Sequence, residues 1–247
     1  ITEMSITANI PPPRAFIMPH DDSINAFAAG TTEQDSVIAI TQGALKQLTP
    51  LELKALVAHE VSHIANGDTK MNRRITAVIY GFMSLTAISY LLFKIADLTN
   101  SATSKSSKNN VFIITIISFI MACFIYLMSK ILEVFGKIIQ SLLSRKREYY
   151  ADSQAIVSMR LTLPIYSLLT KLNNPKSIQP SLRDKASPEY QHFYFHNFSK
   201  MNLMATHPPL HKRIEAVQSM MTKAEIALSK KPNKDKTLYE LHGDNWS

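Results

Sequence analysis

Two long runs without a charged residue constrain this chain more than any other feature. Residues 75–93 and 111–129 are each 19 residues long and contain no Asp, Glu, Lys or Arg. At 1.5 Å of rise per residue, a helix of that length crosses the roughly 30 Å hydrocarbon core of a bilayer. Residues 99–110 between them are rich in Ser, Thr, Asn and Lys, which predicts a solvated loop. The pattern predicts a transmembrane hairpin, with two fully buried core helices as the alternative.

A segment just upstream of the first apolar run carries a complete set of helix signals. Residues 51–66 place apolar side chains at helical spacing. Thr49 and Glu52 match a capping box, and Pro50 occupies the first helical position, where its missing N–H costs nothing. Gly67 follows as a stop signal. The start, the face and the end therefore predict one helix.

This predicted helix carries the motif His59-Glu60-Val61-Ser62-His63. On a helix, His59 and His63 stand one turn apart on the same face. Two imidazoles at this spacing can bind one zinc ion, and Glu60 beside them can take a proton from a metal-bound water. A chance occurrence of the motif is the alternative, which the capped helix beneath it disfavours.

A pair of carboxylates follows the second apolar run. Apolar spacing over residues 131–143 predicts that the helix continues, and it leads through a basic cluster to Glu148 and Asp152. These two lie four residues apart, hence on one helix face, so one can bind the metal while the other accepts the N–H of a ligating imidazole. The hairpin permits this because it returns the chain to the side it left. Alternatively, Glu148 is an exposed partner in a helical salt bridge and the basic cluster only flanks the membrane.

Four short segments near the N-terminus have the composition of strands: residues 5–10, 15–18, 24–29 and 37–41. The last is apolar enough to be central in a sheet, and Thr41 then caps a short helix through Leu48. Strands followed by a metal-bearing helix predict a small α+β unit of the zincin type.

Composition bounds the partners. The chain has 247 residues, 46% of them hydrophobic, with 6 Gly and 12 Pro, which excludes a disordered or fibrous protein. The formal net charge of +8 is typical of chains that bind nucleic acid or an anionic membrane surface. No interleaved basic and aromatic pattern accompanies it, so we favour the lipid bilayer and expect no nucleic-acid partner; a basic nucleic-acid-binding module stays as an alternative. The single cysteine, Cys123, allows no disulfide framework.

Two motifs together resemble a known family. HEVSHIANGD at residues 59–68, followed after the hairpin by SRKREYYAD at residues 144–152, is similar to the membrane metalloproteases of the heat-shock protease HtpX family, which are related to CAAX prenyl endopeptidases and mitochondrial quality-control proteases. The resemblance implies that Glu148 is the third zinc ligand beside His59 and His63. It also implies that Asp152 and Asp68 support the ligands.

A further segment resembles the family's NAFAxG motif, an edge strand beside the active site. An exposed strand edge offers unpaired N–H and C=O groups, which bind an extended peptide by strand addition. The resemblance therefore implies a substrate-binding role for four residues: Asn25, Ala26, Phe27 and Ala28.

Residues 206–209, Thr-His-Pro-Pro, with Arg213 resemble the family's THPxxxxRI segment. The resemblance implies that His207 donates a hydrogen bond to the oxyanion of the tetrahedral intermediate. A lone histidine before two prolines is otherwise more often a turn residue. Arg213 is expected to support this loop or to cap a helix end.

The resemblance covers residues 5–217. This sequence departs from the family in one place, because typical members have another membrane hairpin before the first strand. The departure leaves the native start of the chain open. We expect an α+β, zincin-like metalloprotease domain, mainly helical with a small mixed sheet. Its first half is expected at residues 1–74, the transmembrane hairpin at 75–129, its second half at 130–228 and a polar tail at 229–247. Residues 173–200 are expected to cover the cleft or to select substrates.

These features imply a zinc-dependent membrane endopeptidase with one catalytic zinc ion. The excess of Lys and Arg on the catalytic side of the hairpin predicts an active site that faces the cytoplasm. The resemblance implies that the membrane is a bacterial inner membrane. By resemblance, its substrates are misfolded or damaged membrane proteins, in quality control and stress response. A CAAX-type prenyl-peptide protease and a non-catalytic zinc-binding membrane adaptor are the alternatives.

Overall fold

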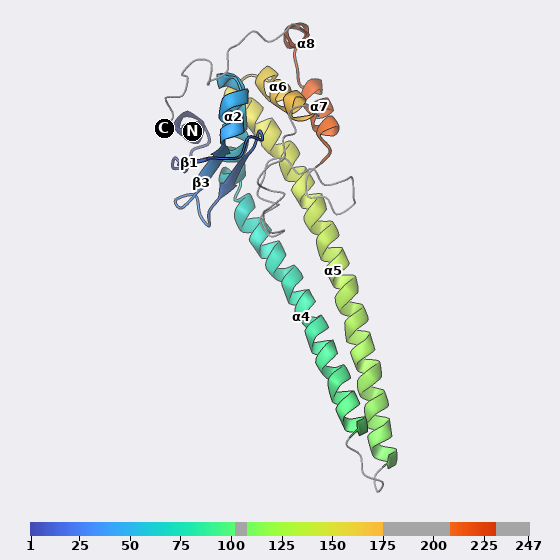
Figure 1. Cartoon of the computed structure of the whole chain (residues 1–247). Helices are drawn as coiled ribbons and strands as arrows, with labels where there is room; N and C mark the ends of the chain where they lie inside the picture. Colours follow the sequence, from blue (N-terminus) through green and yellow to red (C-terminus); the bar gives the residue numbers. More distant parts are fainter. Residues whose placement is uncertain (102–107, 175–207, 231–247) are drawn as a thin grey trace. The chain divides into compact units, whose positions relative to one another are not determined.

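The computed structural model describes residues 1–101, 108–174 and 208–230. The chain separates into two compact units, one made of residues 1–71 and 141–247 and the other of residues 72–140 (Figure 1). His207, residues 175–200 of the expected cover and the tail from residue 231 lie outside the described residues.

The first unit contains a three-stranded mixed sheet in the order β1-β3-β2. β1 (Arg14–Met18) pairs in parallel with β3 (Val37–Thr41), and β2 (Ala26–Ala29) pairs with β3 antiparallel. β3 is central because its apolar side chains are buried, with Ile38 fully inaccessible. Three predicted strands and the central place of the last are confirmed. β2 is an edge strand, as predicted.

The prediction of a strand over residues 5–10 is wrong, because the segment begins with helix α1 (Thr2–Thr7). Ile1, Met4, Ser5 and Ala8 follow helical spacing and face the core, whereas Ile6, which the strand pattern turned inward, is 71% exposed. Burial of Met4 against the core outweighs the alternation in the sequence.

Helix α3 (Pro50–Ala65) begins and ends as predicted. The Thr49 side chain accepts a hydrogen bond from the Glu52 N–H, and the Glu52 carboxylate accepts one from the Thr49 N–H. Short helix α2 (Gln42–Gln47) precedes it, capped by Thr41 as predicted. α3 packs against β2, α1 and α6 (Leu163–Leu172), so its two imidazoles are held on a helix buried on most sides.

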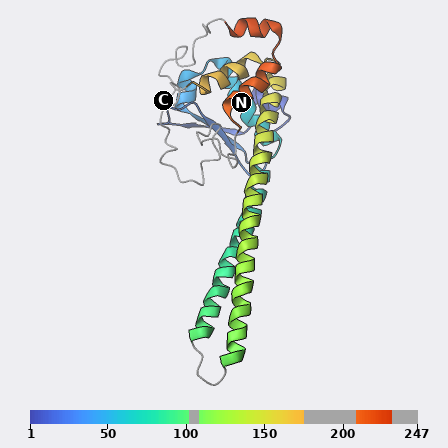
Figure 2. The same cartoon turned by 90° about the vertical axis from the view of Figure 1, so that its right-hand side faces the viewer.

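The second unit consists of parts of two long helices, α4 (Asp68–Ser101) and α5 (Lys108–Met159). Both predicted apolar runs are helical, and α5 continues past residue 129 as expected. The prediction of a loop over residues 99–110 is wrong at both ends, because α4 runs to Ser101 and α5 starts at Lys108; residues 102–107 lie outside the described residues. Figure 2 shows the two helices running side by side, as Figure 1 does, and the Ser129 hydroxyl donates to the Phe82 carbonyl between them.

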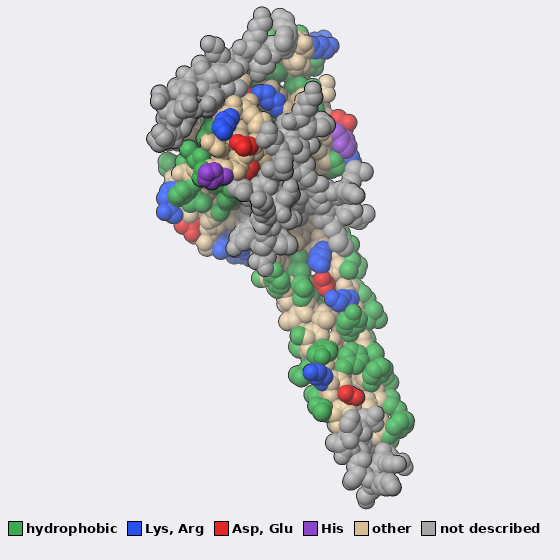
Figure 3. Space-filling model, in the orientation of Figure 1, with side chains coloured by type: hydrophobic (Ala, Val, Ile, Leu, Met, Phe, Trp, Pro, Cys, Tyr) green, Lys and Arg blue, Asp and Glu red, His purple; other side chains and the backbone are tan. Residues whose placement is uncertain are grey.

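Both helices are long and apolar enough to cross a membrane, and only 11% of the most apolar window of each is buried. Hydrophobic side chains cover much of the visible face of these helices (Figure 3). Such exposed apolar surface excludes the alternative of buried core helices, since their side chains would be covered by protein.

Two further helices complete the first unit after α6. α7 (Leu210–Ser219) packs on α6, and α8 (Lys223–Ser229) is tied to the start of α6 because Glu225 accepts a hydrogen bond from the Thr162 N–H at 2.9 Å. α7 brings Arg213 into the interior, where its side chain is only 1% exposed.

Candidate metal centre

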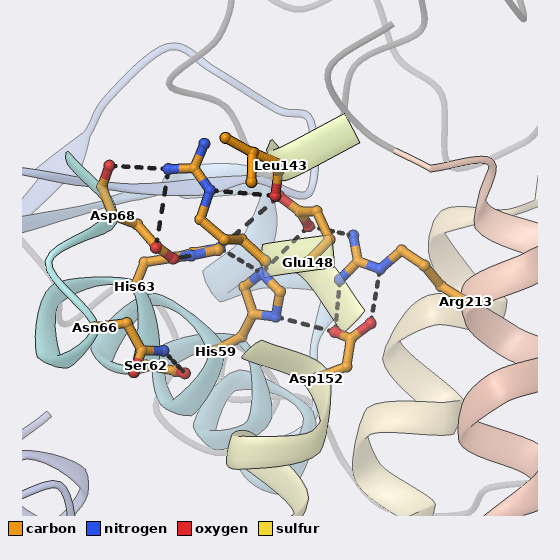
Figure 4. Close-up of polar contacts among 10 residues, drawn as sticks. His59, Ser62, His63, Asn66, Asp68, Leu143, Glu148, Asp152 and Arg213 are labelled. Carbon is orange, nitrogen blue, oxygen red and sulfur yellow. Dashed lines mark hydrogen bonds and ion pairs between the residues drawn. The ribbon is translucent and has the colours of Figure 1, made fainter. Parts of the chain in front are cut away.

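Two imidazoles of α3 and one carboxylate of α5 converge in the first unit (Figure 4). The Nε2 atoms of His59 and His63 lie 3.1 Å apart. The Glu148 carboxylate reaches them with Oε2 at 3.6 Å from His59 Nε2 and Oε1 at 3.8 Å from His63 Nε2. His59 and Glu148 are almost fully buried, and the His63 side chain is 17% exposed. The three residues predicted as ligands therefore lie together, although 85 positions separate His63 from Glu148.

The geometry fits a small divalent cation. Bonds of about 2.0–2.1 Å in a tetrahedral zinc site place neighbouring ligand atoms about 3.3–3.4 Å apart. The observed separations of 3.1, 3.6 and 3.8 Å bracket that value. If each imidazole donates from Nδ1, both Nε2 lone pairs and a carboxylate point at one another, and a cation between them or a proton on one ring removes this repulsion. The donor set of two nitrogens and one oxygen is one that zinc accepts.

The second ring nitrogen of His59 is held by a buried ion pair. His59 Nδ1 lies 3.0 Å from Asp152 Oδ1. Arg213 donates to the same carboxylate from Nε at 2.8 Å and from Nη2 at 2.6 Å, and its Nη1 lies 2.9 Å from Glu148 Oε2. Asp152 thus orients the His59 imidazole, and Arg213 balances the charges of the two carboxylates. Figure 4 shows these contacts converging from α3, α5 and α7.

These contacts shift the proton affinities of the groups. Burial alone lowers the pKa of His59, but hydrogen bonds with Asp152 and Glu148 raise it to about 9 in the metal-free chain. Burial raises the pKa of Asp152, yet the Arg213 charge opposes this and leaves the pKa below its ordinary value. Asp152 is therefore a carboxylate at neutral pH, and a metal ion bound at His59 must displace a proton.

The second ring nitrogen of His63 has a matching partner. His63 Nδ1 lies 2.7 Å from Asp68 Oδ2, and Asp68 is the first residue of α4. Arg147 Nη1 donates to the Asp68 backbone carbonyl at 3.1 Å. The sequence placed Asp68 near the ligands but assigned Arg147 only to the basic cluster. Its place directly before Glu148 was the one signal that could have found it.

Glu60 lies beside this group on α3 and is 3% exposed. Burial raises the pKa of its carboxyl, while the imidazoles of His63 and His59 and the backbone N–H of Ala28 lower it. The general base candidate therefore contacts the edge strand β2 directly. A carboxyl with a raised pKa next to two imidazoles is suited to exchange protons near neutral pH.

The pairing of β2 decides which of its backbone groups face outward. The Thr41 N–H donates to the Asn25 carbonyl, so Asn25 and then Phe27 face β3, whereas Ala26 and Ala28 face the opposite edge, on which no described strand pairs. The Asn25 side chain is buried and accepts a hydrogen bond from the Ala26 N–H at 2.9 Å. Of the four residues predicted to bind substrate, Ala26 and Ala28 thus present backbone to the edge, and Asn25 shapes the strand.

A pocket of about 400 Å³ lies where β2 ends. It is lined by residues from two segments, 30–36 and 64–70. Asp35 closes the first segment, because its carboxylate accepts hydrogen bonds from the backbone N–H groups of Thr31 and Thr32. Its lining mixes polar residues such as Thr31 and Asn66 with apolar ones such as Ile64.

Comparisons with known proteins show the family of this chain. The profile of peptidase family M48 matches residues 1–221. A protease HtpX homolog of Lactobacillus acidophilus is 32% identical over 223 residues, covering 89% of this chain and 72% of the relative. A protease HtpX homolog of Streptococcus equi subsp. equi is 29% identical over 226 residues, covering 89% of this chain and 71% of the relative.

One solved structure shares the fold. The crystal structure of S. mikatae Ste24p matches with a TM-score of 0.50 at 19% identity. The match covers 87% of this chain and 49% of that protein, so this chain spans about half of its length. The likeness concerns the arrangement of the helices and the small sheet.

Proposed function

This chain belongs to peptidase family M48 and is a membrane-bound metallopeptidase, and from this premise we propose that it is a zinc-dependent endopeptidase with His59, His63 and Glu148 as the zinc ligands. When bound, zinc supplies a Lewis acid that polarises the scissile carbonyl and activates water. The observation that carries the proposal is the convergence of two Nε2 atoms and a carboxylate beside a buried Glu60.

Glu60 is the proposed general base and acid. Its carboxylate takes a proton from the attacking water and delivers one to the leaving amine. Asp152 and Asp68 accept hydrogen bonds from the Nδ1–H groups of the two imidazoles, which leaves the lone pairs of both Nε2 atoms for the metal. By resemblance, His207 donates to the oxyanion; it lies outside the described residues.

The β2 edge is the proposed peptide-binding element. An extended substrate adds to the strand through the outward carbonyl groups of Ala26 and Ala28, since the Ala26 N–H already donates to the Asn25 side chain and the Ala28 N–H to Glu60. The Ala28 contact with Glu60 keeps the substrate backbone next to the base. Main-chain pairing supplies affinity with little sequence selectivity, which suits a protease of misfolded proteins. Substrate side chains then reach the pocket at the end of β2.

One experiment tests the role of Glu60 and the metal together. Glu60→Gln protein, purified in detergent, is expected to keep one zinc ion per chain and to lose at least about 100-fold of casein cleavage. A chelator should abolish cleavage by the wild type, and added zinc should restore it. Glu215→Gln, an exposed carboxylate on α7, serves as the matched control. Undiminished cleavage by Glu60→Gln would reject the assignment.

We place the active site on the cytoplasmic face of a bacterial inner membrane. Three basic residues precede the first apolar run, Lys70, Arg73 and Arg74, and a larger group follows the second. Maleimide labelling in a Cys123→Ser background tests this orientation. A cysteine at Ser106, in the connecting segment, should react from the periplasm, and one at Lys146 should react only from the cytoplasm. The reverse pattern would overturn the orientation.

Misfolded or damaged membrane proteins are the proposed substrates, in keeping with an enzyme that is itself anchored in the bilayer. A farnesylated CAAX peptide, assayed beside casein and a destabilised membrane protein, separates the prenyl-peptide alternative. The non-catalytic adaptor predicts zinc binding without cleavage of any of the three substrates. A shift of duplex DNA that weakens with salt would revive the nucleic-acid alternative.

A further inference from the structure

Arg147 is held against Asp68 and against the preceding turn of its own helix rather than extended into solvent. Its Nη1 donates to the Asp68 carbonyl at 3.1 Å and lies 3.9 Å from Asp68 Oδ1, and its Nε donates to the Leu143 carbonyl at 3.3 Å. The side chain is only 15% exposed. A cation that merely flanks a membrane keeps its charged head in water, so this burial calls for another role.

Each of the two ligand imidazoles contacts an aspartate that is in turn held by an arginine. His59 contacts Asp152, which Arg213 holds, and His63 contacts Asp68, which Arg147 holds. The His63–Asp68–Arg147 series differs in one respect, because Arg147 donates mainly to the backbone carbonyl of Asp68. It therefore fixes the first residue of α4 against the turn of α5 that carries Glu148.

The charges around the site support the same reading. Among the described residues, four carboxylates surround the site: Glu60, Asp68, Glu148 and Asp152. Arg147 and Arg213 compensate two of these charges, and a divalent cation compensates the other two. Removal of Arg147 leaves Asp68 without this donor and the whole centre one charge more negative.

We propose that Arg147 is a positioning residue for metal binding, which anchors Asp68 and through it fixes the orientation and tautomer of His63. The proposal rests on the proposed function only in taking His63 as a ligand. Arg147 touches neither the substrate nor the reacting atoms, so it acts on how tightly the metal is held. Loss of such support from a ligating histidine typically costs about 10–100-fold in metal affinity.

The test measures zinc affinity of the full chain in detergent by competition with a chromophoric chelator. Arg147→Met is expected to weaken zinc binding about 10–100-fold. Lys146→Met removes the same charge from the exposed neighbouring position and should leave the affinity unchanged. Arg147→Lys, which can still donate to one carbonyl, should recover part of the loss. Equal affinities of Arg147→Met and Lys146→Met would overturn the proposal.

Two further readouts separate positioning from general destabilisation. Asp68→Asn should weaken zinc binding to a similar extent, and Arg147→Met should add little to it, because both act through His63. The visible absorption spectrum of the cobalt-loaded protein should change in Arg147→Met and not in Lys146→Met. If Arg147→Met does not fold, Arg147→Lys and Asp68→Asn are combined instead. Losses of zinc affinity that multiply in this double variant would show that the two residues act independently and would overturn the proposal. A wild type that binds no zinc would instead reject the proposed function.

Discussion

Arg213 and Asp152, 61 positions apart, form a two-point ion pair in the interior, with the two donor–acceptor distances at 2.8 and 2.6 Å. Burial lowers the pKa of the Arg213 guanidinium, but the charges of Asp152 and Glu148 more than reverse this, so it stays charged. The pair joins α7 to the ligand-bearing turn of α5. The position of α7 is thereby linked to the candidate metal centre.

Replacement of Arg213 by Met should destabilise the protein strongly. It leaves two buried carboxylates without their counter-charge, and breaking a buried pair in this way costs about 3–5 kcal/mol. The thermal midpoint of the metal-free protein in detergent measures the loss. Arg213→Lys keeps the charge but not the two-point geometry and should fall between Met and wild type. A metal-free midpoint unchanged in Arg213→Met would show that the pair does not support the fold.

A second buried carboxylate, Glu52, joins α3 to α6 without touching the metal ligands. It is 1% exposed and accepts hydrogen bonds from the Thr49 N–H at 2.9 Å, from Lys171 Nζ at 2.6 Å and from the Ser167 hydroxyl. Glu52→Ala removes the capping box and the charge partner of Lys171, so we expect a loss of about 2–4 kcal/mol in unfolding free energy. Urea or thermal unfolding followed by circular dichroism checks this.

The controls for Glu52 follow from its partners. Glu52→Gln keeps the acceptor for Thr49 and should cost less than Ala. Lys171→Met removes the charge partner, and its effect should largely vanish in a Glu52→Gln background, because the two residues are coupled. Additive losses would contradict the direct contact.

Helix α3 could be predicted to its ends because all its signals are local. The capping box, Pro50 and Gly67 lie within the helix or beside it, and tertiary contacts reinforce them rather than oppose them. Glu148 and Asp152 could be placed on one face by spacing alone. Only the family resemblance, however, said which of them faces the imidazoles.

Two features could not be read from the sequence, for different physical reasons. Residues 1–10 fit both an alternating pattern and a helical one, and burial of Met4 in the core decides between them. Arg147 sits in a run of three basic residues, of which Lys146 is exposed and Arg147 is largely buried. Which cation turns inward depends on where Asp68 lies, and that is set by contacts 79 positions apart.

Gly43 should tolerate no side chain. A Cβ placed there would lie 2.1 Å from the Asp22 carbonyl oxygen, and the Gly43 N–H donates to the Asp21 carbonyl at 2.9 Å. Both neighbours are backbone, so Gly43→Ala must displace either α2 or the chain between β1 and β2, at a cost of about 1–3 kcal/mol or more. Thermal unfolding measures it.

Gly67 provides the comparison for Gly43. Its φ is +66°, but a Cβ there would meet nothing within 4 Å. Gly67→Ala should therefore cost only the left-handed backbone penalty of about 1–2 kcal/mol. If Gly43→Ala lowers the unfolding free energy less than Gly67→Ala does, the close approach of the Asp22 backbone to Gly43 is contradicted.

Glu225 should make the docking of α8 on α6 dependent on acid pH. The backbone N–H of Thr222 donates to its carboxylate and lowers the pKa below 4.5, and the Thr162 N–H, 2.9 Å away, adds to this. Because the folded-state pKa is the lower one, the stabilisation is complete above pH 4.5 and is lost as the pH falls through the lowered value. At pH 6, Glu225→Gln should lower the thermal midpoint relative to the wild type, and by pH 3 that difference should shrink. Glu215→Gln, which removes an exposed carboxylate on α7, should show no such convergence. A difference for Glu225→Gln that stays constant or widens on acidification would mean that the ionised carboxylate is not what holds α8 in place.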